Sequence, residues 1–433
     1  MVTTDSERSY LRLVREPAPL GAYVRPLERD YRYVARLLSS GFPVGTGVVV
    51  DACHLDRSSD LRAEARDQRL ETVLDPKSIE LSTVAGITRS GVLDLPWSVG
   101  AMDAPDQFDD RRITEYTESL AKTALQMGVD AVLAPSHYLE SIPSPWLERD
   151  VALTAALREK LDSSSAGKGV RVYYPLASNL RAFASDAAVK RVVKTLSDLA
   201  RSGAANGVWL RMHAFGTNTA GALTLPRYLR LARSLHEIGL PVVAEKTGTV
   251  GLALLAFGAV VGVESGITHG ERYDHRTLMK KPRGPQRGGL APRVYLPPIG
   301  VFLPRKAATT LLNTRGIRGT FGCQLLCCRR GIEDMLADPR RHFLVSRSHE
   351  VEALARVPGA LRVEHYFSNW LRHAADRATR VAQVLPQVEK HRKRLDVWRA
   401  TLSEQRDRDQ AAPPSVCPPL YGESDEGRDV SGS

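Results

Sequence analysis

The sequence predicts an α/β fold, a (β/α)8 barrel of the TIM type, followed by a helical and basic appendage. Three observations support this prediction. Short apolar runs alternate with helical stretches from about residue 45 to residue 320, 43% of the 433 residues are hydrophobic and 25% charged, and the chain has neither a glycine-rich dinucleotide fingerprint nor a Walker A sequence. Alternating strands and helices favour a parallel sheet covered on both faces. Eight such units in about 270 residues fit a closed barrel better than an open sheet.

Each predicted strand is a β-rich apolar run that ends in polar residues. The runs are 48–50, 92–94, 131–133, 170–174, 207–210, 241–244, 259–263 and 294–296. Between them lie amphipathic patterns, and the clearest spans 226–238, with Leu229, Leu231 and Leu235 as apolar residues. Pro226 suits the first turn of that helix, because no N–H is needed there.

The remaining chain divides into segments by composition. Tyr31, Val34, Leu37 and Leu38 have helical spacing ahead of the barrel, and the residues from Ser403 onward are rich in Asp, Arg, Ser and Pro. Such a composition is typical of disorder. The predicted segments are a helical lead-in (1–44), the barrel (45–320), a basic helical subdomain (321–400) and a disordered tail (401–433).

Composition also narrows the cellular setting. The longest apolar run, from Val250 to Val263, stops at Glu264 and is too short to span a bilayer. The first residues lack the apolar region of a signal peptide. Five cysteines in 433 residues do not make a disulfide framework. We therefore expect a soluble, cytoplasmic protein without a membrane partner.

The positive charge is concentrated in one stretch. The net charge is +11, and no acidic residue occurs between Asp274 and Glu333, although that stretch is rich in Arg, Gly and Pro. A solvated surface loop is one interpretation, but a long stretch of one sign favours a polyanion. We therefore predict nucleic acid as a partner and leave open whether a second copy or another protein also binds. The predicted contacts are Lys280, Lys281, Arg283 and Arg287.

Candidate active-site residues follow the predicted strands, because function in such barrels belongs at the carboxyl ends of the strands. The carboxylates Asp94 and Glu264 across one pocket would suit chemistry at a sugar anomeric carbon. A lysine at a strand end can instead form a Schiff base with a carbonyl substrate, which makes Lys246 the centre of an alternative lyase or aldolase reading. Lys246 could also simply pair with Glu245 or Glu264. Predicted substrate contacts are Arg211, His213, Lys246 and Ser265.

A cysteine cluster indicates a metal site. Cys323, Cys327 and Cys328 lie within six residues, and histidines follow at His342, His349 and His365. Zinc commonly takes three thiolates and one imidazole in a tetrahedron. The alternative is that the cysteines are small buried hydrophobic residues. The residues predict a zinc site that folds the subdomain.

The order of these features resembles the tRNA-guanine transglycosylases, which are TIM barrels with a zinc subdomain late in the chain. The resemblance rests on the cysteine cluster, on the Glu364-His365 pair and on the unit from Leu240 to Glu264. It implies structural Zn²⁺ with His365 as the fourth ligand. It also implies exchange of a guanine or deazaguanine base in tRNA or DNA, with Glu264 as nucleophile and Asp94 as acid/base residue. A nucleic-acid-binding barrel without catalysis is a further alternative.

Overall fold

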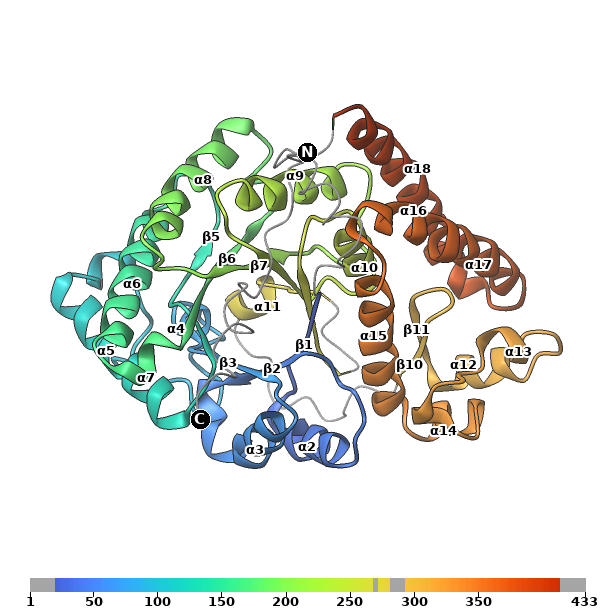
Figure 1. Ribbon diagram of the computed structural model, residues 1–433, viewed down its shortest axis with the longest axis horizontal. Helices are drawn as coiled ribbons and strands as arrows, with labels where there is room; N and C mark the ends of the chain where they lie inside the picture. The colour runs from blue at the N-terminus through green and yellow to red at the C-terminus, as the bar shows by residue number, and fades with distance from the viewer. Residues whose placement is uncertain (1–19, 268–271, 281–292, 413–433) are drawn as a thin grey trace, which may run out of the picture.

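The computed structural model describes residues 20–267, 272–280 and 293–412, and it shows a closed parallel barrel (Figure 1). Each barrel strand pairs with the next along the chain, and β1 closes the ring by pairing with β9. The short strand β5 (Tyr138–Leu139) extends the sheet beside β6. The predicted (β/α)8 barrel is thus confirmed. Its strands are β1 (Gly21–Val24), β2 (Gly47–Asp51), β3 (Glu71–Asp75), β4 (Ala131–Leu133), β6 (Arg171–Asn179), β7 (Gly207–His213), β8 (Val242–Glu245) and β9 (Gly262–Ser265).

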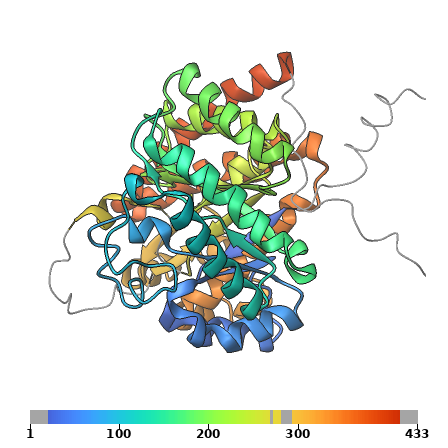
Figure 2. The same ribbon diagram turned by 90° about the vertical axis from the view of Figure 1, so that its left-hand side faces the viewer.

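Helices cover the outside of the barrel, and the view onto its α5 to α8 side shows them as an outer layer (Figure 2). The helix expected at 226–238 is α9, which begins at Thr224 and ends at His236. Aromatic and β-branched side chains such as Tyr23, Val49 and Trp209 fill the barrel interior. The helices up to the last barrel strand are α2 (Tyr31–Ser39), α3 (Ser59–Asp67), α4 (Ser78–Leu81), α5 (Asp110–Met127), α6 (Pro145–Asp162), α7 (Ser165–Lys168), α8 (Asp186–Arg201), α9 (Thr224–His236) and α10 (Val250–Ala256).

Two predicted strands do not belong to the barrel. Residues 92–94 lie in turns between α4 and α5, with Asp94 exposed. Residues 294–296 form part of β10 (Arg293–Leu296), which pairs antiparallel with β11 (Val301–Pro304) in a separate hairpin. The two barrel strands that the sequence analysis did not predict are β1 and β3. The barrel therefore begins near residue 21 and not at 45. Strand β3 is hard to recognise because Glu71 and Asp75 are charged, yet both are buried.

The chain after β9 builds a small subdomain and then returns to the barrel. Helix α15 (Pro339–Ala355) lies beside the barrel, where the hydroxyl of Tyr33 donates to Asp338 at 2.7 Å and Arg340 pairs with Asp30 at 2.8 Å (Figure 1). The last helix extends to Ala411, so the predicted disorder is wrong for 401–411, while 413–433 lie outside the described residues. The other late helices are α11 (Arg276–Met279), α12 (Arg305–Leu312), α13 (Arg318–Phe321), α14 (Ile332–Ala337), α16 (Arg362–Tyr366), α17 (Arg372–Val384) and α18 (Glu389–Ala411).

Among the described helices, none combines the length and the apolar content that crossing a membrane requires.

Candidate functional site

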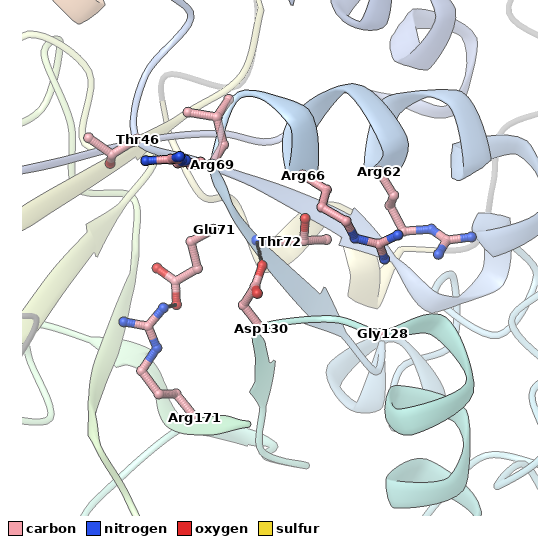
Figure 3. A pocket seen from close by; sticks show the side chains of 10 residues that line it. Thr46, Arg62, Arg66, Arg69, Glu71, Thr72, Gly128, Asp130 and Arg171 are labelled. Carbon is pink, nitrogen blue, oxygen red and sulfur yellow. Dashed lines mark hydrogen bonds and ion pairs between the residues drawn. The ribbon is translucent and has the colours of Figure 1, made fainter. Parts of the chain in front are cut away.

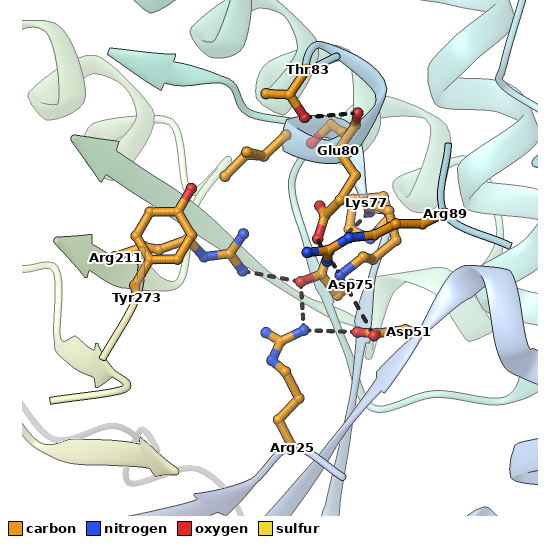
Figure 4. Close-up of polar contacts among 12 residues, drawn as sticks. Arg25, Asp51, Asp75, Lys77, Glu80, Thr83, Arg89, Arg211 and Tyr273 are labelled. Atoms are coloured by element: carbon orange, nitrogen blue, oxygen red, sulfur yellow. Dashed lines mark hydrogen bonds and ion pairs between the residues drawn. The ribbon is translucent and has the colours of Figure 1, made fainter. Parts of the chain in front are cut away.

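The carboxyl ends of the barrel strands hold a network of buried charges, and Arg25 lies at its centre (Figure 4). This residue follows β1. Its Nε and Nη2 donate to the two carboxylate oxygens of Glu264 at 2.8 and 3.0 Å. Its Nη1 reaches Asp51 at 2.9 Å and Asp75 at 2.6 Å. Glu264 also accepts a hydrogen bond from the indole N–H of Trp209 at 2.8 Å. One guanidinium therefore joins the ends of β2, β3 and β9.

A second guanidinium continues the network across the barrel mouth. Arg211 lies on β7, and its Nε donates to Glu245 at 2.6 Å while its Nη2 donates to Asp75 at 3.0 Å. The ring of Tyr273 covers this guanidinium, with the ring centre 5.7 Å from the central carbon (Figure 4). Asp75 thus accepts from both arginines and links the two halves of the network.

Lys77 completes the network just after β3. Its backbone is left-handed, with φ at 63°, and its Nζ lies 2.6 Å from Glu80 and 3.5 Å from Asp51. Burial alone would lower the pKa of Lys77, but Asp51 and Glu80 raise it above the ordinary value. A protonated, fully paired ammonium of this kind orients its neighbours rather than attacking a substrate.

The carboxylates of the network are held ionised by their cations. Burial alone would raise the pKa of Asp75, and Lys77, Arg25 and Arg211 bring it well below its usual range. Burial alone would also raise the pKa of Glu245, but Arg211, Arg25 and Lys246 bring it below its ordinary value. Charges buried this deeply persist only when each is paired.

The segment from Arg272 to Met279 covers part of the barrel mouth. The N–H of Ala85 donates to the carbonyl of Leu278 at 2.8 Å, and the N–H of Ala214 donates to that of Tyr273 at 2.9 Å. His275 stacks on Tyr138 with ring centres 3.6 Å apart. Tyr273 and Leu278 are buried, so this segment closes Arg211 and Asp75 off from solvent.

Lys246 is more accessible than Arg25, Lys77 and Arg211. Its side chain is 25% exposed, compared with 6% for Arg25 and Arg211. The residue follows β8 in a left-handed conformation, with φ at 51°, and its N–H donates to the carbonyl of Glu264 at 2.9 Å. Its Nζ lies 3.6 Å from Glu245. Non-glycine residues held in this conformation are concentrated at functional sites.

The structure brings together some of the predicted site residues and separates others. Four of the predicted residues lie together at the barrel mouth, namely Glu264, Arg211, Lys246 and Ser265. The carbonyl of Ser265 accepts the backbone N–H of Arg25 at 2.9 Å. His213 lies at the end of β7, and its Nδ1 accepts the N–H of His275 at 3.1 Å; burial lowers the pKa of His213. Glu264 pairs with Arg25 and not with the side chain of Lys246.

Asp94 is not part of this site. Its carboxylate is exposed in a turn, because the run 92–94 does not form a strand that could aim it at the mouth. The predicted pair of carboxylates from Asp94 and Glu264 is therefore wrong. Sequence analysis missed Arg25 and Asp75, since β1 and β3 were not recognised, and it also missed Asp51 at the end of β2. One signal was present, because Asp51 directly follows the apolar run 48–50.

The cysteines form a compact cluster with a histidine in the small subdomain. The ligand atoms of Cys323, Cys327, Cys328 and His342 all lie within 4.8 Å of one another. The Sγ–Sγ distances are 3.9 Å from Cys323 to Cys327 and 3.6 Å from Cys327 to Cys328. A tetrahedral zinc site with bonds of about 2.3 Å places sulfurs about 3.8 Å apart, so the spacing fits.

His342 on α15, and not His365, faces the cysteines. Its Nδ1 lies 3.5 Å from Cys328 Sγ, and its Nε2 lies 3.0 Å from the carbonyl of Tyr295. This hydrogen bond places the ring proton on Nε2, so the lone pair of Nδ1 faces the cysteines. His365 lies on α16 and contacts Asn369 at 2.9 Å. His365 is therefore not part of the cluster, because the imidazole beside the cysteines comes from α15.

The predicted nucleic-acid contacts are only partly described. Lys280 is exposed just after α11. The other three, Lys281, Arg283 and Arg287, lie outside the described residues. Nucleic-acid binding stays a prediction.

Comparison with known proteins gives a match neither to a protein-family description nor to a curated protein. Among solved structures, the chain is similar to an HpcH/HpaI aldolase from Desulfitobacterium hafniense DCB-2, with 8% identity over 61% of this chain and 91% of the aldolase at a TM-score of 0.33. It is also similar to the citrate synthase SbnG, with 13% identity over 57% of this chain and 86% of the synthase and a TM-score of 0.32. The carboxyl transferase domain of Rhizobium etli pyruvate carboxylase matches with 14% identity over 84% of this chain and 54% of the carboxylase chain, at a TM-score of 0.37. Similarity at this level assigns no reaction to this chain.

The expected membership in the tRNA-guanine transglycosylases is wrong. No family description matches, and the similar structures named above are an aldolase, a citrate synthase and a carboxyl transferase domain rather than transglycosylases. The predictions of a glycosyltransferase activity and of a role in modifying tRNA or DNA followed from that resemblance, and they are wrong as well. The geometry agrees, because Glu264 is occupied by Arg25 and Trp209 and its expected partner Asp94 lies elsewhere.

Proposed function

We propose that the chain is a barrel lyase of the aldolase type, in which Lys246 reacts with the carbonyl group of a small substrate. Lys246 combines a strand-end position, a left-handed backbone and a side chain that is 25% exposed, compared with 8% or less for Arg25, Lys77 and Arg211. Arg25, Lys77 and Arg211 hold their carboxylates at 2.6–2.8 Å and so serve to keep the mouth in shape, whereas Lys246 lies 3.6 Å from Glu245. This contrast is the observation that supports the proposal.

The chemistry follows from an amine at a partly exposed site. The neutral amine of Lys246 adds to the carbonyl carbon, and the carbonyl oxygen leaves as water once it has gained two protons. The resulting imine, when protonated, draws electrons from the neighbouring carbon–carbon bond and so permits its cleavage. Asp51 is the most exposed carboxylate of the network, at 17%. Burial alone would raise its pKa, and Lys77, Arg25 and Lys246 lower it, so Asp51 is ionised and able to accept a proton.

Borohydride trapping tests this proposal. The protein is incubated with a panel of 2-oxo acids and aldehydes, reduced, digested and analysed by mass spectrometry. We expect one substrate class to leave a secondary amine on Lys246. The variant Lys246→Arg should lose the adduct, while Lys390→Arg, a change of an exposed lysine on α18, should keep it. Labelling spread evenly over surface lysines, or none at Lys246, would exclude the Schiff-base mechanism.

We also propose that the cysteine cluster holds a structural Zn²⁺ ion, with Cys323, Cys327, Cys328 and His342 as ligands. The cluster links the turn that carries the cysteines to α15, which packs on the barrel. A site closed by four protein ligands stabilises a fold rather than supplying an open position for a substrate.

Elemental analysis distinguishes the two histidines. Protein purified without chelator should contain about one zinc per chain. His342→Ala should lose most of it and lower the unfolding temperature. His365→Ala is the matched control and should keep the full zinc content. Equal zinc loss in both variants, or no zinc in the parent protein, would refute the ligand set.

A further inference from the structure

A basic pocket lies at the amino-terminal face of the barrel, at the end opposite Lys246 (Figure 3). Its volume is about 310 Å³, within the range of small-ligand sites. The walls come from α3, from the turn after it and from the first residues of β3 and β6. Its charged residues are Arg62, Arg66, Arg69, Arg171, Glu71 and Asp130.

The two carboxylates of the pocket are already engaged. Glu71 pairs with Arg171 at 2.9 Å and accepts the hydroxyls of Tyr23 and Tyr173 from inside the barrel, at 2.5 and 2.9 Å. Asp130 accepts the backbone N–H of Thr72 at 2.8 Å. Because the N–H of Thr72 carries no charge, Asp130 offsets one of the three arginines on α3 and its following turn, and the pocket keeps an excess of positive charge.

Arg66 and Arg69 have no ion-pair partner among the described residues, and both are exposed. The guanidinium of Arg66 lies close to the backbone of Gly128, where an added Cβ would be 3.2 Å from its Nη2. Arg62 is held in place, since its Nη1 donates to the Met127 carbonyl at 2.8 Å. Burial and the neighbouring charge of Arg66 lower the pKa of Arg62. The pocket thus keeps like charges close together, and an anion would relieve their repulsion.

The backbone at Arg69 gives an independent indication. α3 ends in a Schellman motif, in which the N–H of Arg69 donates to the Arg66 carbonyl at 3.0 Å and that of Leu70 to the Ala65 carbonyl at 2.8 Å. Arg69 is left-handed there, with φ at 56°. Glycine is the residue that this position favours, because it alone avoids the Cβ penalty. The chain carries an arginine where glycine would be the more stable choice.

We propose that this pocket binds the phosphate or diphosphate group of a small phosphorylated molecule through Arg62, Arg66 and Arg69. A doubly charged anion would be attracted by the positive charge of the guanidiniums that line this pocket, since guanidiniums bind phosphate through charge-assisted hydrogen bonds. The carboxylates Glu71 and Asp130 border the same pocket and would repel a phosphate chain that continued past it. This favours a small ligand over a nucleic-acid backbone. The proposal is independent of the chemistry at Lys246.

Calorimetric titration with inorganic phosphate and pyrophosphate tests the proposal. The parent protein should bind pyrophosphate, and Arg66→Gln combined with Arg69→Gln should weaken binding by about tenfold for each guanidinium removed. The matched control is Arg372→Gln with Arg380→Gln, which removes the same charge from exposed positions on α17. This control should bind as the parent does.

Arg69→Gly separates binding from folding. This variant should bind pyrophosphate about tenfold more weakly, while its unfolding temperature stays the same or rises, because glycine suits the left-handed position. Two results would overturn the proposal: no pyrophosphate binding in the millimolar range by the parent protein, or equal weakening by the α17 control. Tight binding of a short DNA duplex that pyrophosphate cannot displace would assign the pocket to nucleic acid instead.

Discussion

The two ends of the barrel use the same side chains in opposite ways. At the carboxyl ends of the strands, the guanidiniums of Arg25 and Arg211 are buried and divided among four carboxylates. At the amino-terminal face, Arg66 and Arg69 are exposed and face a pocket without ion-pair partners among the described residues. Buried charge has to be matched for the chain to fold, whereas exposed unmatched charge is available to a ligand. Position alone therefore does not show which arginines act in binding.

Removal of Arg25 should have the largest effect, because it leaves Glu264, Asp51 and Asp75 without their shared cation. We expect Arg25→Leu to lower the free energy of unfolding by about 3–5 kcal/mol. Urea unfolding measures this, with Arg372→Leu on α17 as the exposed control. A loss below about 1 kcal/mol would mean that the network at the mouth is no more tightly organised than a surface ion pair.

Glu264→Gln should have a smaller effect. The amide keeps the shape of the side chain and can still accept from Trp209, and Arg25 retains Asp51 and Asp75. We expect a loss of about 1–2 kcal/mol of stability, in the range of one charge-assisted hydrogen bond. Glu118→Gln, the same change at an exposed position on α5, serves as the control. A loss as large as that of Arg25→Leu would place Glu264, and not Arg25, at the centre of the network.

Acid should weaken the charged network at the barrel mouth. Asp75 and Glu245 have folded pKa values below their ordinary ones. Their contribution to stability is therefore complete above the unfolded values of about 4 and is lost as the pH falls through the folded values. Each unit of pKa difference is worth about 1.4 kcal/mol. Stability measured from pH 6 to pH 3 should fall below about pH 4, and Arg25→Leu should flatten that part of the curve.

The smallest effect on stability is expected at the amino-terminal face. Arg66→Gln with Arg69→Gln should change the free energy of unfolding by less than about 0.5 kcal/mol, because neither guanidinium has an ion pair to lose among the described residues. Thermal and urea unfolding check this. A loss comparable with that at Glu264 would show that these arginines stabilise the barrel, and the contrast between its two ends would disappear.

Local patterns were sufficient to predict the barrel, since the alternation of apolar runs and amphipathic stretches is visible within short windows. The run at 48–50 and the helix at 226–238 appear as β2 and α9. Strand β3 was missed because Glu71 and Asp75 interrupt its apolar character. Their partners come from distant strands, as with the hydroxyl of Tyr173, 102 residues from Glu71. No local pattern reveals that a charged residue will be buried and paired.

The residues of the two sites also divide into those that local sequence predicts and those that only the tertiary structure decides. The sequence by itself placed Glu264 and Lys246 at strand ends and identified the three cysteines, since those features depend on neighbouring residues alone. The fourth member of the cysteine cluster, His342, was selected from several histidines by the packing of α15. The partner of Glu264 was decided by barrel closure, because β1 pairs with β9 and brings Arg25 across 239 residues of chain. Coulomb interactions depend on distance in space, and only the tertiary structure fixes that distance.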